Sequence, residues 1–409
     1  MDYPKLRYIE AFPVETDQHA RIHIRDPLNY ANTPLLLPYP TYFIITHFDG
    51  QHSRVDIQER FARQFGQILP REKIDEVIQQ LDEYYYLDSS RFAAWRQKIH
   101  VAFLCSPVRE MAHADTCYSS QADAFVEQTT AFFASPQGPG LPMVKPQAQL
   151  SIRGLIAPHI DLRVGGCAYA WGYKELAERC DADLFILLGT SHYGMGNLFV
   201  ATEKDYNTPL GVVKTDREFI GALQRRYSED LFADELLHRT EHSLEFQTLF
   251  LQYVFGGKRE FTVVPILVSS FHHMIATQTP PAEVPRVAAF LNALQKTMAQ
   301  SKKKICLVAG VDFAHVGQKF GDQGPLTEDF LRWVETEDRR LIQALEKVDH
   351  ADFFAQIAKD GDRRRVCGFS PMYTFLHLVG AKEGKLLKYD RSVDPTTQSS
   401  VSFASLAFY

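Results

Sequence analysis

The segment Leu184-Phe185-Ile186-Leu187-Leu188, followed directly by Gly189-Thr190-Ser191-His192, indicates how this chain folds. Five apolar residues that end in glycine and polar residues are typical of a strand buried on both faces. From about residue 105 onward, runs of this kind alternate with helical patterns. The predicted strands are 150–156, 184–188, 261–268 and 305–309, and the predicted helices lie near 168–180, 216–227, 241–255, 285–300 and 328–347. This alternation predicts an α/β domain with a largely parallel or mixed sheet flanked by helices.

The first hundred or so residues have a different pattern. One helical pattern opens at Asp56 and ends at Gly66, and a second runs from Ile74 to Leu81. The segment 84–88 is expected to begin a small β-wing. The sequence therefore predicts a winged-helix-like α+β accessory domain over 1–104, followed by the large domain over 105–409. Its rhythm resembles that of PqqD-like peptide-binding modules, while packing or partner binding without further chemistry is the simpler expectation.

Composition excludes several classes of function. The 409 residues carry a net charge of −6, and residues 1–100 contain 12 Lys and Arg against 14 Asp and Glu, so no basic face for nucleic acid is expected. No apolar run approaches the roughly 20 residues that cross a bilayer, and the first residues do not resemble a signal peptide. The six cysteines are scattered without a CxxC pair, which favours reduced thiols. We therefore expect a cytoplasmic protein with no membrane and no nucleic-acid partner.

Polar motifs follow three of the predicted strands. They are Pro158-His159-Ile160-Asp161, Gly189-Thr190-Ser191-His192 and Asp312-Phe313-Ala314-His315. In an α/β sheet, ligands bind beyond the carboxyl ends of the strands, so these histidines are expected to converge. A fourth motif, Glu241-His242-Ser243-Leu244-Glu245, opens a helix and places two carboxylates one turn apart.

Each motif also has an ordinary structural explanation. A lone histidine near a strand end is more often a hydrogen-bonded loop residue than a ligand, and Glu241 and Glu245 could form a solvated helix face. The co-occurrence of four motifs that pair a histidine with an acid or a hydroxyl favours one shared pocket. Two histidines and a carboxylate suit a divalent transition metal and leave coordination positions open, and a further histidine could transfer protons.

At these residues the sequence resembles the Memo family. The four motifs match in order, as do Cys367-Gly368 and the ending Ser399-Ser400-Val401-Ser402-Phe403-Ala404, and the resemblance covers roughly 106–409. The additional N-terminal module resembles the form called AmmeMemoRadiSam system protein B, which implies AMMECR-like and radical-SAM protein partners. The resemblance also implies a fold similar to that of class III extradiol ring-cleaving dioxygenases, which hold non-haem iron(II) on two histidines and a glutamate.

The resemblance implies that His159 and His192 are metal ligands. It also implies a cysteine ligand in an Asp-Phe-Cys-His motif, where this chain has Ala314. Either another residue completes the site, or the metal is held weakly, or none binds. Asp312 is our choice as third ligand, with His315, His242 and Glu241 as alternatives. His242, His315 and Glu241 are the expected catalytic residues. Iron is the expected metal, with copper and zinc as alternatives.

Two functions of different class follow. The first is a metal-dependent oxidoreductase or dioxygenase-like enzyme, in which His242 or His315 moves a proton to or from the substrate. The second is a binding protein that retains the pocket without the chemistry and holds a peptide or a product of the radical-SAM partner. The absence of a thiol at Ala314 favours the second. A zinc hydrolase is a weaker expectation, because the sequence has no HExxH motif.

Overall fold

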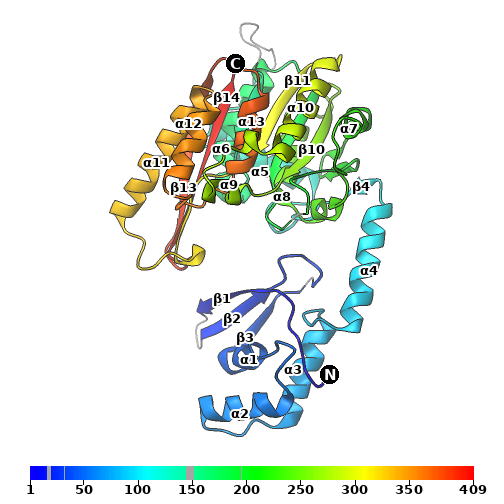
Figure 1. Cartoon of the computed structure of the whole chain (residues 1–409), viewed down its shortest axis with the longest axis vertical. Helices are drawn as coiled ribbons and strands as arrows, with labels where there is room; N and C mark the ends of the chain where they lie inside the picture. Colours follow the sequence, from blue (N-terminus) through cyan, green and yellow to red (C-terminus); the bar gives the residue numbers. More distant parts are fainter. Residues whose placement is uncertain (16–19, 32, 144–151, 195) are drawn as a thin grey trace. The chain divides into compact units, whose positions relative to one another are not determined.

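An eight-stranded mixed sheet forms the centre of residues 106–409 in the computed structural model (Figure 1). The structure describes residues 1–15, 20–31, 33–143, 152–194 and 196–409. The strand order is β12-β14-β5-β11-β6-β10-β7, and β13 pairs with β14 outside this path. The strands of this sheet are β5 (Gly154–Ala157), β6 (Leu184–Thr190), β7 (Phe199–Ala201), β10 (Thr262–Val268), β11 (Ile305–Gly310), β12 (His315–Gly317), β13 (Gly384–Asp394) and β14 (Ser399–Phe408).

Four neighbouring strands of this sheet run parallel. β11 pairs with β5 on one side and with β6 on the other, and β6 pairs with β10. β14 and β7 add antiparallel strands on either side. The carboxyl ends of the four parallel strands therefore lie at one edge of the sheet, which is the edge that carries the polar motifs. The prediction of a mixed sheet flanked by helices is confirmed; the start of the predicted strand 150–156 lies outside the described residues.

Helices cover both faces of the sheet. The helices of this unit are α5 (Ala122–Ala134), α6 (Leu162–Arg179), α7 (Arg217–Gln224), α8 (His242–Phe255), α9 (His272–Ala276), α10 (Pro285–Gln300), α11 (Glu328–Glu346), α12 (His350–Lys359) and α13 (Phe369–Leu378). α5, α6 and α8 pack on one face and share an apolar core with it. α7 and α9 to α13 contribute to the core on the other face. Burial on both faces explains why β6 reads as a continuous apolar run.

A short second sheet lies outside the main one. It joins β4 (Val108–Arg109), β8 (Asp205–Thr208) and β9 (Gly211–Val213) in the order β4-β8-β9. This pairing holds the beginning of the unit against the segment that follows β7, and it brings Arg109 into the interior.

The N-terminal unit, Met1–Cys105, has its own sheet and core. Its elements are β1 (Glu10–Glu15), β2 (Ala20–Arg25), β3 (Leu35–Pro38), α1 (Tyr39–Ile45), α2 (Arg54–Phe65), α3 (Arg71–Glu83) and α4 (Ser90–Cys105). The three strands form an antiparallel sheet and precede the helices. The β-wing expected at 84–88 does not form: this segment turns after α3 and makes a single bridge from Leu87 to Leu6, because its backbone pairs with the N-terminal residues 5–7.

No helix in the described part of the chain is long and apolar enough to cross a membrane.

Candidate metal centre

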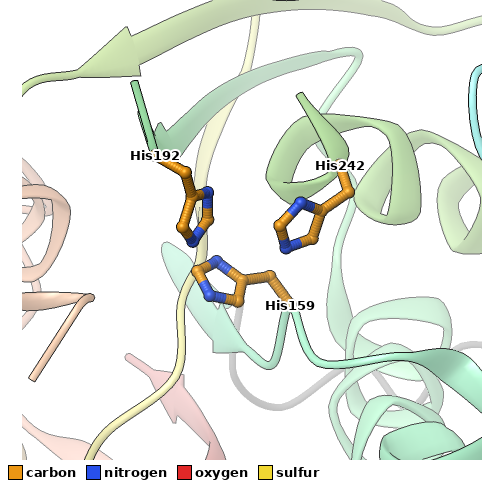
Figure 2. Close-up of side chains that lie close together, drawn as sticks. All are labelled: His159, His192 and His242. Atoms are coloured by element: carbon orange, nitrogen blue, oxygen red, sulfur yellow. The ribbon is translucent and has the colours of Figure 1, made fainter. Parts of the chain in front are cut away.

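Three histidines from distant parts of the chain meet at the carboxyl edge of the sheet. His159 and His192 each follow a parallel strand by two residues, after β5 and β6, and His242 is the first residue of α8. One ligand atom of each lies within 4.8 Å of the others. Their ring centroids are 4.6 to 5.1 Å apart, and Figure 2 shows the three rings facing one another. Sheet topology and the start of one helix therefore assemble the cluster.

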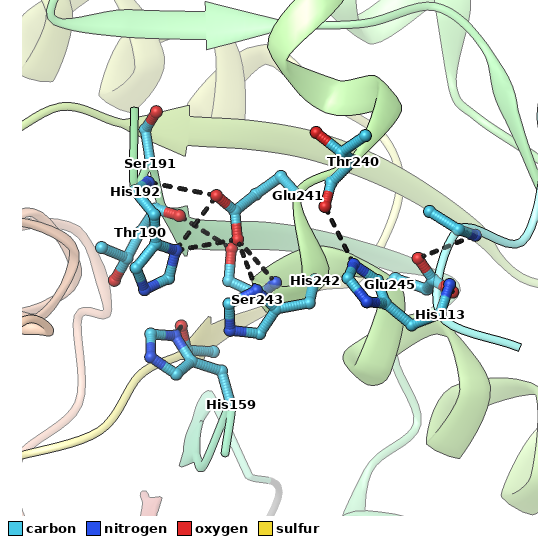
Figure 3. A network of polar contacts seen from close by, with 12 residues as sticks. His113, His159, Thr190, Ser191, His192, Thr240, Glu241, His242, Ser243 and Glu245 are labelled. Carbon is cyan, nitrogen blue, oxygen red and sulfur yellow. Dashed lines mark hydrogen bonds and ion pairs between the residues drawn. The ribbon is translucent and has the colours of Figure 1, made fainter. Parts of the chain in front are cut away.

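Glu241 orients two of these rings. It is the N-cap residue of α8, and its buried carboxylate accepts the backbone N–H of Ser243. The same carboxylate accepts the backbone N–H of His192 at 3.1 Å and lies 3.0 Å from that residue's Nδ1 (Figure 3). Nδ1 of His242 lies 3.3 Å from it. Burial raises the pKa of Glu241, but the two histidines and these hydrogen bonds hold the pKa well below its usual range.

His159 is fixed by different partners. Its Nδ1 lies 3.1 Å from the carbonyl oxygen of Gly310, and its backbone N–H donates to Asp312. Its Nε2 is 3.2 Å from Sγ of Cys367 and 3.5 Å from Oδ2 of Asp312. Burial lowers the pKa of His159 well below its usual value and raises the pKa of Asp312 to about 7. A neutral imidazole with a bonded Nδ1 presents Nε2 as an electron-pair donor.

The thiol beside the cluster belongs to Cys367 and not to position 314. Ala314 is fully buried and packs with Val316 and Val334 in a small apolar cluster. Cys367 directly precedes Gly368, the N-cap residue of α13, and its sulfur faces the ring of His159. Ala314 therefore lies in an apolar environment, and Cys367 is the residue whose thiol contacts the histidine cluster.

The structure brings together all six residues predicted for the site. Asp312 hydrogen-bonds to the backbone of His159, Glu241 contacts His192, and His242 completes the three-histidine group. His315 begins β12 and lines a pocket of about 280 Å³ together with His192 and Cys367. Burial lowers the pKa of His315 to about 4. Which of these residues bind metal or transfer protons remains a prediction.

A buried ion pair supports the cluster from behind. Arg109 and Glu245 are both fully buried and contact one another. Arg109 also donates from Nη2 to the carbonyl oxygen of Glu241 at 3.0 Å and from Nε to that of His238 at 2.9 Å. Glu245 accepts the backbone N–H of His113 at 3.0 Å. The alternative of a solvated face for Glu241 and Glu245 is therefore wrong, since both side chains are buried.

Sequence reasoning missed Arg109 altogether. The only signal was Glu245, one turn beyond Glu241, because a carboxylate buried in a helix needs a cationic partner. His113, on the loop before α5, was missed as well: its Nε2 lies 2.9 Å from the carbonyl oxygen of Thr240, and its ring faces that of His242.

The donor set fits a transition-metal ion. Nδ1 of His192 is hydrogen-bonded, and among the described residues Nε2 of His192 and Nε2 of His242 have no hydrogen-bond partner in the protein. Two imidazoles bound at about 2.1 Å to one ion lie at most about 4.2 Å apart, so small movements would bring nitrogens within 4.8 Å onto one ion.

Sequence comparisons match most of this chain to known proteins. The profile of the family described as Memo-like protein matches residues 109–407. A MEMO1 family protein of Aquifex aeolicus is 31% identical over 99% of this chain and 100% of its own length. One from Methanopyrus kandleri is 30% identical over 73% of this chain and 98% of its own length. The crystal structure of an uncharacterized protein from Escherichia coli K12 matches with a TM-score of 0.36 and 10% sequence identity. The match covers 63% of this chain and 99% of the other protein.

Proposed function

This chain belongs to the family of Memo-like proteins, and from that premise we propose that it binds a divalent transition metal on His159, His192 and His242. The observation that carries the proposal is the convergence of three neutral or hydrogen-bonded imidazoles on one point. Cys367 and Asp312 lie against His159 and are the candidates for a fourth ligand or for a hydrogen-bond acceptor beside the ion.

The chain's own residues would tune such a site. Glu241 holds Nδ1 of His192 and so fixes which nitrogen faces the cluster, and the Gly310 carbonyl does the same for His159. A bound ion of this kind would supply open coordination positions and Lewis acidity. His315, which lines the adjoining pocket and is neutral at ordinary pH, is the group we propose to accept a proton from a bound molecule.

We propose iron as the metal and dioxygenase-like redox chemistry as the activity to test first. The binding-protein alternative loses its main support, because Cys367 supplies a thiol that Ala314 does not. On the resemblance alone, we also propose AMMECR-like and radical-SAM proteins as partners. A cytoplasmic location would keep the Cys367 thiol reduced.

The test is metal content. The full chain would be purified anaerobically without a histidine tag and analysed by elemental mass spectrometry beside the double variant His159→Ala/His192→Ala. His273→Ala, which removes an exposed histidine from α9, is the matched control. We expect near-stoichiometric metal in the wild type and the control, and loss in the folded double variant. Equal metal content in the wild type and the double variant would refute the proposal.

A further inference from the structure

The pocket beside the histidine cluster combines apolar walls with positive charge. Its volume is about 280 Å³, near the lower end for small-molecule sites. Val268, Phe320, Val366 and Phe369 give it apolar walls, and hydroxyl groups of serine and threonine add hydrogen-bonding capacity. None of the described residues that line it is an aspartate or a glutamate, whereas Arg365 is cationic and three histidines add ring nitrogens. A ligand with an apolar body and a negative charge matches this lining.

Arg365 is the permanent cation of the pocket. It lies in the loop between α12 and α13, and its side chain is 39% exposed. One N–H donates to Asp322 at 2.7 Å, and Nη1 makes two long contacts of 3.4 Å to the carbonyl oxygens of His315 and Arg363. A guanidinium has five N–H donors, so donors remain for a ligand.

Two carboxylates beside the pocket, Asp322 and Asp362, are engaged by other groups. Asp322 divides its two oxygens between Arg365 and the backbone N–H of Gly317. Asp362 is buried, accepts the backbone N–H of Val366 and lies 3.6 Å from Nε2 of His272. Both acids lie against basic residues of the pocket without lining the cavity, and Glu241 likewise reaches the pocket only through Nδ1 of His192.

We propose that this pocket binds a small carboxylate-bearing molecule with an apolar body, and that Arg365 receives its carboxylate. A single planar guanidinium matches the two oxygens of a carboxylate, and the first turn of α13, which includes Phe369 and Ser370, adds the positive end of a helix to the pocket. The assignment rests on the proposed function, because the molecule would lie against His192 and Cys367 of the metal centre. It goes beyond that function by giving the chemical class of the ligand.

The experiment compares benzoate with benzamide, which have similar shape and differ in charge. Each would be titrated by ligand-observed NMR into the metal-free full chain, into Arg365→Gln and into Arg363→Gln. Arg363→Gln is the matched control, because Arg363 lies in the same loop but points to the ring of Trp333. We expect the wild type and the control to prefer benzoate by about tenfold, and Arg365→Gln to lose this preference. If Arg365→Gln fails to fold by circular dichroism, Arg365→Lys replaces it, with a reduced preference expected.

Three results would overturn the assignment: equal binding of the two probes, no saturable binding of benzoate, or an unchanged preference in the Arg365 variant. Tighter binding of phenyl phosphate than of benzoate would also exclude a carboxylate site. Metal content would be measured on separate, untreated samples of the same proteins. A wild type without bound metal that still prefers benzoate would refute only the proposed function. A wild type that holds metal but shows no preference for benzoate would refute only this inference.

Discussion

Replacement of Arg109 by methionine tests whether the buried ion pair stabilises the cluster. Methionine fills much of the space but leaves Glu245 without its cation and three carbonyl oxygens without a donor. Breaking a buried pair by removing one partner costs about 3–5 kcal/mol. Glu245 keeps the Tyr118 hydroxyl and the backbone N–H of His113 as donors, so we expect a loss of about 3 kcal/mol in the free energy of unfolding.

The assay must report on residues 106–409 alone, because a chain of two units need not unfold in one step. In a Trp95→Phe background the remaining tryptophans, Trp171 and Trp333, both belong to this unit. Urea unfolding followed by their fluorescence would give its stability. The control is Arg332→Met, which breaks an ion pair whose side chains are 68% and 88% exposed and should cost less than about 0.5 kcal/mol.

A loss below about 1 kcal/mol for Arg109→Met, or one equal to that of the control, would refute the reasoning. The variant should also bind metal more weakly at temperatures where it is folded, because Arg109 fixes the carbonyl of Glu241 and thereby the start of α8. Unchanged metal affinity would show that the cluster does not depend on this support.

Three further predictions follow from single contacts. Glu241→Gln should leave the chain folded but weaken metal affinity about 10–100-fold in a competition titration. The reason is that Nδ1 of His192 loses its charged acceptor. Gly310→Ala would place a methyl group 2.6 Å from the Gln247 amide and closer still to a main-chain carbonyl of α8. Urea unfolding should therefore show a loss of about 1–3 kcal/mol in the free energy of unfolding. The control is Gly194→Ala, whose methyl group would contact no other atom and should leave the stability unchanged. NMR titration should give Asp49 a pKa of about 2, because two backbone N–H groups donate to its carboxylate. The contribution of Asp49 to stability is then present above pH 3.8, the usual pKa, and is lost as the pH falls toward 2. A titration midpoint near 3.8 would contradict the geometry.

The sequence predicted the strand ends well because burial on both faces leaves an unambiguous pattern. β6, β10 and β11 lie where apolar runs end in polar motifs. The convergence of His159 and His192 followed from this topology, since parallel strands present their carboxyl ends at one edge. Helix bounds were less certain: the helix predicted near 216–227 is α7, Arg217–Gln224, with Asp216 as its capping residue.

The features that the sequence did not predict depend on long-range packing. Cys367 lies 208 residues from its neighbour His159, and Arg109 lies 136 residues from Glu245. The periodicity of a helix or a strand relates only residues that are a few positions apart, so it does not indicate such pairs. His242 was predicted as part of the site. Its position within the cluster depends on the direction of α8 relative to the sheet, which no pattern of residues specifies.

Charge explains how three imidazoles can pack closely together at this edge of the sheet. Protonated rings at centroid distances near 5 Å would repel one another strongly in a buried site. Burial lowers the pKa of His242 to about 3, and that ring also lies at the positive end of α8, where a cation is disfavoured. Burial opposes a charge on His192 as well, but Glu241 raises its pKa, so any proton held by the cluster resides there. Glu241, ionised at the N-terminus of the same helix, is thus favoured in its charged form by both the helix and the histidines. It faces the nitrogen of His192 that does not point into the cluster. The arrangement keeps two rings neutral as electron-pair donors and holds one negative charge directly behind the third, which is the charge distribution that a divalent cation would stabilise.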